Sequence, residues 1–123
     1  MELKEVLAAH QKWISTGGNE GTRADLRNAI LQETDLHGAN LQSADMQNAK
    51  LSVADLMQAN LRLANLRGAD LWMADMKDAD LQGTELQGAN LSEATNLTQA
   101  QINSAITDET TVLPKGIKSG GPI

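Results

Sequence analysis

The sequence predicts a solenoid built from short extended segments and corners. Three observations lead to it: a five-residue repeat, a small and a large apolar residue within each unit, and glycines placed two residues after the large one. The large residue, called the centre below, is leucine or methionine, and alanine lies two residues before it except at Thr34 and Thr84. The fourteen centres are Leu26, Leu31, Leu36, Leu41, Met46, Leu51, Leu56, Leu61, Leu66, Leu71, Met76, Leu81, Leu86 and Leu91.

A period of five fits neither an α-helix nor a straight strand. On a helix the apolar positions would scatter around the whole circumference, and on a strand residues five apart would point to opposite faces. Both conflicts disappear if each unit is a short extended segment followed by a corner. The small residue and the centre then point inward, whereas the residue before the centre and the two after it point outward. Gly38, Gly68, Gly83 and Gly88 occupy the second corner position, where a turn favours glycine.

The run of Ala-(Asp/Asn)-Leu-X-X units resembles the pentapeptide repeat proteins over about three-fifths of the chain. The resemblance implies an all-β solenoid, a right-handed quadrilateral β-helix of about 3.5–4 coils with four pentapeptides per coil. Residues twenty apart would then stack at about 4.8 Å. The family also admits phenylalanine at the centres, and this sequence has none.

Both ends of the chain carry signals for capping helices. We expect residues 1–22 to form an N-terminal capping helix and linker, residues 23–96 the β-helix, and residues 97–123 a capping helix and an extended tail. The first helix follows from apolar residues at helical spacing before Gly17 and Gly18. The second follows from a capping box at 98–101, which predicts a helix from about Gln99 to Ile106. His10 is expected to be a partly buried residue of the first cap.

Composition narrows the possible functions. The formal net charge of −6 disfavours direct binding to nucleic acid, which needs a basic surface. With no cysteine and only two histidines, we expect no disulfide, metal site or cofactor. No signal peptide or membrane-spanning run is evident, so a cytoplasmic protein without membrane contact is expected, with a monomer favoured.

The many carboxylates have a simpler explanation than catalysis. Seven aspartates among the sixteen acidic residues occupy the position before a centre, where a short polar side chain can hydrogen-bond the local backbone. No nucleophile, base or metal-ligand motif accompanies them. The sequence therefore indicates a protein that is not an enzyme.

We number the four sides by the centres of the first coil, which are Leu26, Leu31, Leu36 and Leu41 in that order. Sorting the outward residues by side leaves two features that the repeat does not require. The second side carries a candidate interaction patch of Ile30, Val53, Trp72 and Met73, and exposed apolar clusters with tryptophan are typical of binding surfaces. An alternative is that the C-terminal tail covers this patch through Val112 and Leu113. The third side carries a candidate acidic column of Asp35, Asp55 and Asp75.

Three functions are compatible with this reading. The leading one is a non-catalytic module or scaffold that binds another protein through a solenoid face. The second is mimicry of DNA. The resemblance implies it, because some pentapeptide repeat proteins are acidic rods that occupy the DNA-binding surface of type II topoisomerases and so protect against quinolones. Six basic residues interrupt the repeat surface and weigh against it: Arg23, Arg27, Lys50, Arg62, Arg67 and Lys77. The third is a small structural or regulatory accessory, of the kind common among helix-capped cyanobacterial relatives.

Overall fold

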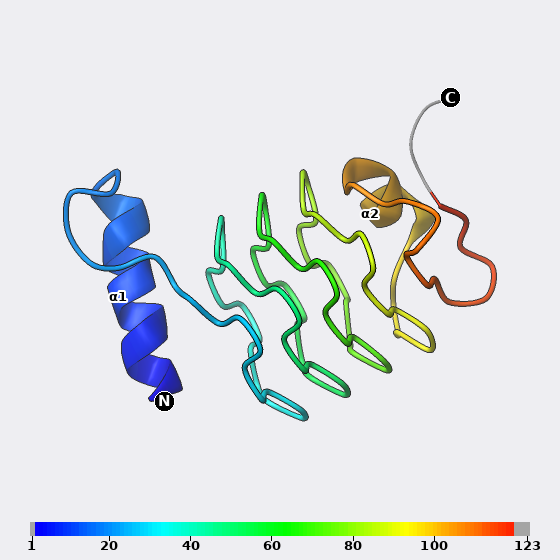
Figure 1. Cartoon of the computed structure of the whole chain (residues 1–123), viewed down its shortest axis with the longest axis horizontal. Helices are drawn as coiled ribbons and strands as arrows, with labels where there is room; N and C mark the ends of the chain where they lie inside the picture. Colours follow the sequence, from blue (N-terminus) through cyan, green and yellow to red (C-terminus); the bar gives the residue numbers. More distant parts are fainter. Residues whose placement is uncertain (1, 120–123) are drawn as a thin grey trace.

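A computed structural model describes residues 2–119 of the chain. It contains two helices, α1 (Leu3–Ser15) and α2 (Gln99–Ser104), at opposite ends of a stack of coils. In Figure 1 the coils follow one another from α1 at the left to α2 and the C-terminal tail at the right. The chain is a right-handed four-sided β-helix, as the sequence predicts.

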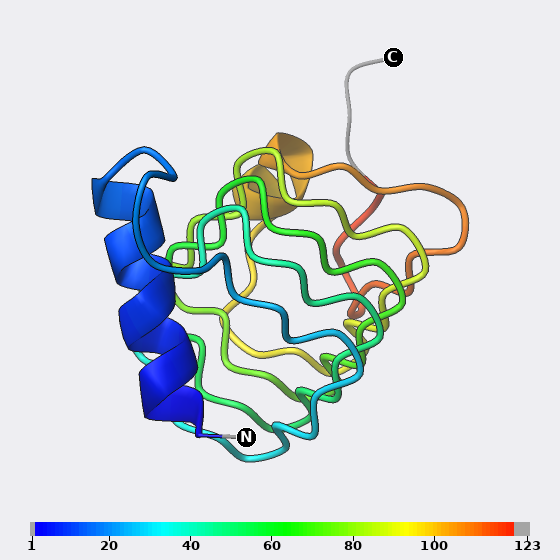
Figure 2. The same cartoon turned by 60° about the vertical axis from the view of Figure 1, so that its left-hand side comes forward.

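The coils stack in strict register. Each side contributes single-residue parallel β-bridges between residues twenty apart, such as Asp25 with Asp45 and Asn40 with Asn60. No longer strand is assigned within residues 2–119. Four pentapeptides therefore make one coil, and Figure 2 shows the coils nearly end-on.

The ten pentapeptides with centres from Leu26 to Leu71 repeat the same hydrogen bonds. The centre Leu26 donates its N–H to Asp45 O at 2.7 Å, and Asn28 donates its N–H to Gln47 O at 2.9 Å, both in the next coil. The corner closes when the Ala29 N–H donates to Leu26 O at 3.1 Å, with Asn28 at φ +60°. A positive φ at the third residue is the geometry of a type II turn, which explains the glycines at equivalent positions.

The centres fill the interior of the coil. All fourteen are no more than 2% exposed, and the alanines beside them complete one continuous core. Among the small residues that are fully buried, Thr84 stands where the others are alanine. Its hydroxyl donates to Leu61 O at 2.6 Å, so the buried oxygen is satisfied.

Helix α1 covers the first coil, and His10 attaches it. The ring is fully buried rather than partly buried as expected. The Ala24 N–H donates to Nδ1 at 2.9 Å, so the ring proton lies on Nε2, which donates to Gln42 O at 2.8 Å. Burial lowers the pKa of His10 and keeps the ring neutral. One side chain thereby pairs two backbone groups at the open edge of the solenoid.

Helix α2 and the tail close the other end. The capping box is confirmed, because Thr98 Oγ1 accepts from the Gln101 N–H at 3.1 Å and Gln101 Oε1 accepts from the Thr98 N–H at 2.8 Å. The helix is shorter than predicted, because Ala105 is extended and Ile106 forms a bridge with Glu85. Ile102 is buried against the core, and the tail adds a last bridge between Asn90 and Val112.

Candidate functional site

The outward polar residues before the centres mostly serve the backbone. In eleven of the fourteen pentapeptides an Asp or Asn Oδ1 accepts the N–H of the residue two positions later. This side-chain turn explains why the repeat favours Asp and Asn there. The three departures are Ile30, Lys50 and Glu85. Two of them lie on the second side.

The second corner position shows a sharper departure. Residues there have φ between +57° and +73°, a region suited to glycine and asparagine. Eight of the fourteen residues there are neither glycine nor asparagine, and three of these eight are apolar: Val53, Leu63 and Met73, at φ +60°, +60° and +58°. A left-handed backbone costs about 1–2 kcal/mol for an ordinary residue, and a β-branched valine is a genuine outlier there. Packing inside the coil does not require these apolar side chains, because they point outward.

Three residues of the candidate patch come together at one corner, which we call the apolar corner: Val53, Trp72 and Met73. The Val53 N–H donates to Trp72 O at 2.8 Å, so the two turns are in direct contact. Their side chains remain 43%, 42% and 41% exposed, respectively.

Ile30 does not belong to the apolar corner. It lies on the flat of the second side, in the line of bridges that joins Ile30 to Lys50 and Lys50 to Asp70. It is 66% exposed and lies two coils from Asp70, towards the N-terminal end.

The C-terminal tail packs elsewhere. Val112 forms its bridge with Asn90, and its N–H donates to Ala89 O at 2.9 Å. Leu113 and Ile117 are partly buried against the core at the end of the coil. The idea that Val112 and Leu113 cover the patch is therefore wrong for the tail as far as residue 119, since the tail continues the solenoid.

The three residues of the candidate acidic column lie in one line of bridges, because Asp35 bridges Asp55 and Asp55 bridges Asp75. Each carboxylate accepts the N–H of the residue two positions later, at 3.0, 2.9 and 3.1 Å respectively. His37 Nδ1 lies 4.0 Å from Asp55 Oδ2, and Asn96 donates to Asp75 Oδ1 at 2.9 Å. Between residues 2 and 119 no group of three His, Cys, Asp or Glu side chains could hold a metal ion.

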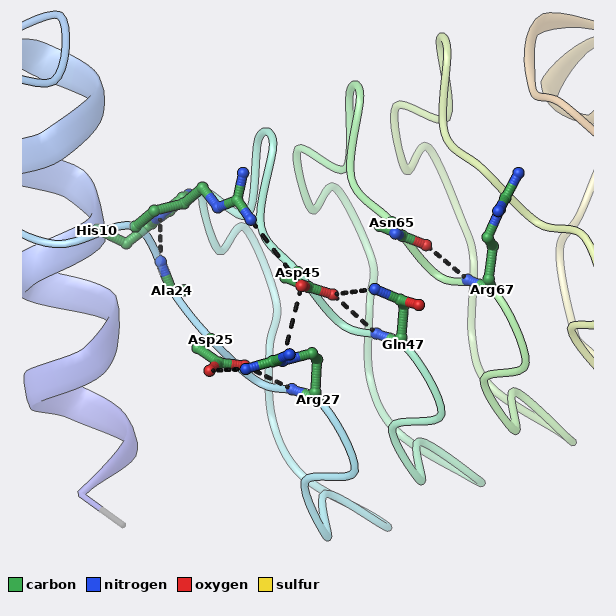
Figure 3. A network of polar contacts seen from close by, with 9 residues as sticks. His10, Ala24, Asp25, Arg27, Asp45, Gln47, Asn65 and Arg67 are labelled. Carbon is green, nitrogen blue, oxygen red and sulfur yellow. Dashed lines mark hydrogen bonds and ion pairs between the residues drawn. The ribbon is translucent and has the colours of Figure 1, made fainter.

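Charge pairing divides the solenoid into two halves. On the first and fourth sides every carboxylate lies within 4.0 Å of an arginine. Figure 3 shows this along the first side, where Arg27 reaches Asp25 and Asp45. The pairs are Asp25–Arg27, Asp45–Arg27, Asp45–Arg23, Asp80–Arg62 and Glu85–Arg67.

The contact between Arg27 and Asp25 also shifts the pKa values of both side chains. The hydrogen bonds from Arg27 lower the pKa of Asp25 to about 2, and Asp25 in turn raises the pKa of Arg27. The pKa of Asp108 in the tail is also lowered, chiefly by hydrogen bonds from Thr110.

The second and third sides have no such pairing. Within residues 2–119 none of their seven carboxylates lies within 4.0 Å of a lysine or arginine nitrogen. Lys50 and Lys77 are on these sides but form no ion pair there. The carboxylates are Glu33, Asp35, Asp55, Asp70, Asp75, Asp78 and Glu93.

Two further surface features lie outside the candidate patch and the acidic column. The first is Leu63, which occupies the same left-handed position as Val53 and Met73 and is 60% exposed, as its place in the pentapeptide predicts. The second is a shallow groove of about 510 Å³ on the first side. It depends on the path of the tail, which no repeat predicts. The groove is lined by Gln47, Asn48, Arg67, Gly68, Gln87, Gly88, Asp108 and Thr110.

Neither helix of the described chain has the length and apolar character needed to cross a membrane.

Comparison with known proteins agrees with the repeat. A sequence profile of pentapeptide repeats matches in eight copies, over residues 22–58, 59–99 and 74–106. A pentapeptide repeat protein from Nostoc PCC 7120 is 32% identical, with 93% of this chain and 91% of that one covered and a TM-score of 0.40. One from the cyanobacterium Cyanothece 51142 is 29% identical, over 79% of this chain and 69% of that one, with a TM-score of 0.37.

A more distant likeness is to QnrB1, a plasmid-mediated fluoroquinolone resistance protein. It is 16% identical over 72% of this chain and 67% of that one, with a TM-score of 0.34. No curated protein sequence matches the chain.

Proposed function

The chain belongs to the pentapeptide repeat family, and on that premise we propose that it is a non-catalytic module that binds another protein through the apolar corner. One observation carries the proposal. Val53 and Met73 hold exposed apolar side chains on left-handed backbone, where the repeat is more stable with glycine or asparagine.

The chemistry of the outer surface supports a binding role over a catalytic one. Most carboxylates before the centres are occupied by backbone N–H groups, and those of the first and fourth sides are also paired with arginine. Tryptophan adds a large, stiff contact area beside two apolar neighbours, which is typical of binding hot spots. Rigid stacking of the coils keeps these side chains in fixed relative positions, so little entropy is lost when a partner docks.

The test is affinity capture from the native host with two matched variants. Trp72→Ala/Met73→Ala removes the two corner residues of the second side, and Arg62→Ala/Leu63→Ala removes those of the fourth side. Proteins captured by wild type should be lost with the first variant and kept with the second, with unchanged circular dichroism. Equal capture by wild type and the Trp72→Ala/Met73→Ala variant would contradict the proposal.

DNA mimicry is a second candidate, favoured only by the unpaired carboxylates of the acidic column. Its three carboxylates span two coil steps, about 10 Å, and the arginine pairs of the first and fourth sides interrupt the negative surface. A gyrase supercoiling assay separates the candidates. Inhibition at low micromolar protein that survives Trp72→Ala/Met73→Ala would favour mimicry over the apolar corner.

A further inference from the structure

The charge division and the apolar corner meet at the same place on the solenoid. Val53 lies two residues before Asp55, and Met73 lies two residues before Asp75, so each of these two coils presents an apolar side chain next to a carboxylate that has no lysine or arginine partner within residues 2–119. The next coil repeats this arrangement in register. The surface is therefore an apolar line beside an acidic line.

From this arrangement we infer that the partner segment is cationic and amphipathic, with lysine or arginine beside large apolar side chains. The inference rests on the function proposed above and specifies the chemistry of the partner. The whole chain has ten basic residues, and all four arginines contact carboxylates of the first and fourth sides. The negative charge left on the second and third sides thus has no arginine partner within residues 2–119.

A helix lying along the solenoid axis has a suitable repeat. One face of an α-helix recurs about every 5.4 Å, and the coils recur at about 4.8 Å. Over the step from Val53 to Met73 the two spacings differ by only about 0.6 Å. Apolar side chains of such a helix would contact Val53 and Met73 while its cations reach Asp55 and Asp75.

The same charges argue against two other occupants. Nucleic acid and anionic membrane surfaces would face two lysines and seven carboxylates that have no lysine or arginine partner within residues 2–119, so both would be repelled. A neutral apolar segment would contact only the apolar corner, and the carboxylates would add nothing to its affinity. Complementary charges on the partner and on this surface would also raise the rate of association.

The test uses an 18-residue amphipathic helix of lysine and leucine as the probe, with calorimetric titration of the full chain. The informative variant is Asp55→Asn/Asp75→Asn. Asparagine keeps the side-chain turn, as Asn60 and Asn65 do in wild type, and removes only the charge. The matched control is Asp25→Asn/Asp80→Asn, which removes the same charge from the arginine-paired sides.

We expect the Asp55→Asn/Asp75→Asn variant to bind the lysine–leucine peptide at least tenfold more weakly than wild type, and the control pair to bind within twofold of it. Trp72→Ala/Met73→Ala should weaken binding by a similar factor. A glutamate–leucine peptide and a lysine–serine peptide should not bind. Equal losses in the two Asp→Asn pairs would show attraction by net charge alone and overturn the inference, as would absence of binding to wild type.

Failure of this inference is distinct from failure of the proposed function. If capture of host proteins depends on Trp72 and Met73 but is unchanged by Asp55→Asn/Asp75→Asn, the cationic partner is wrong and the interaction module stands. If the Trp72→Ala/Met73→Ala variant captures the same proteins as wild type, the module itself is wrong.

Discussion

The inside and the outside of one pentapeptide follow different rules in this protein. In the unit 69–73, Ala69 and Leu71 are almost fully buried and conform to the repeat, whereas Trp72 and Met73 are exposed and depart from it. The interior is occupied by the residues that the coil needs. At the apolar corner the chain instead keeps residues that the coil would be more stable without. The difference separates positions whose residue type is fixed by packing inside the coil from positions that this packing leaves free.

The largest effect should come from enlarging a small interior residue. Ala59 is 1% exposed inside the coil, so Ala59→Leu should cost about 3 kcal/mol through overpacking. Leu61→Met, which conserves volume at the neighbouring centre, should cost less than about 1.5 kcal/mol. Urea unfolding followed by circular dichroism gives both values. Equal losses would show that the coil tolerates expansion and that the interior is not tightly packed.

A smaller loss is expected at the turn that follows α1. Gly21 has φ +75°, and a Cβ there would lie 2.6 Å from the Trp13 backbone nitrogen and would clash with Ala9 O. Gly21→Ala should therefore cost about 1–3 kcal/mol. Gly38 also has a positive φ but nothing within 4 Å, so Gly38→Ala isolates the backbone strain. If the two variants have the same thermal midpoint, the clash with α1 contributes nothing to the loss of stability in Gly21→Ala.

The attachment of α1 should depend on pH. His10 is neutral when folded and its pKa is lowered from 6.5, so the unfolded chain takes up a proton that the folded chain does not. The stability from this group is present above pH 6.5 and is lost as pH falls below it towards the lower folded-state pKa. Thermal midpoints at pH 7.5 and 5.5 should therefore differ more for wild type than for His10→Gln. Identical differences would contradict a neutral, bonded His10.

The smallest effect has the opposite sign. Val53→Asn should stabilise the protein by about 0.5–1 kcal/mol, because asparagine tolerates the left-handed backbone better than a β-branched residue. Leu63→Asn should also be stabilising and serves as the matched change away from the apolar corner. Denaturant midpoints measure both. A loss of stability at Val53 would mean that its side chain supports the coil.

The repeat made most of the fold predictable, because five-residue spacing places the centres inward whatever the rest of the sequence does. The same spacing assigned Val53, Trp72 and Met73 to one region and Asp35, Asp55 and Asp75 to one line. The capping box at Thr98 was predictable because its two hydrogen bonds are local. These features all depend on contacts within a few residues or exactly one coil apart in register.

What the sequence did not predict depends on contacts outside that register. The tail leaves the period of five, so its bridge at Val112 and its distance from the apolar corner follow from tertiary packing. The arginine pairs stay on one side of the coil, within one pentapeptide for Asp25 and Arg27 and between consecutive coils for Arg62 and Asp80, and only the folded chain shows that these side chains meet. His10 was recognised as a cap residue, but its two backbone partners lie 14 and 32 residues away.

The most direct measurement combines stability and binding in one variant, Val53→Asn/Met73→Asn. The backbone should become more favourable at both turns, so the thermal midpoint should rise by several degrees while capture of the host partner is lost. Leu63→Asn should raise the midpoint and keep the partner. Full retention of the partner by Val53→Asn/Met73→Asn, or a fall in its thermal midpoint, would contradict the view that the apolar corner is kept for binding.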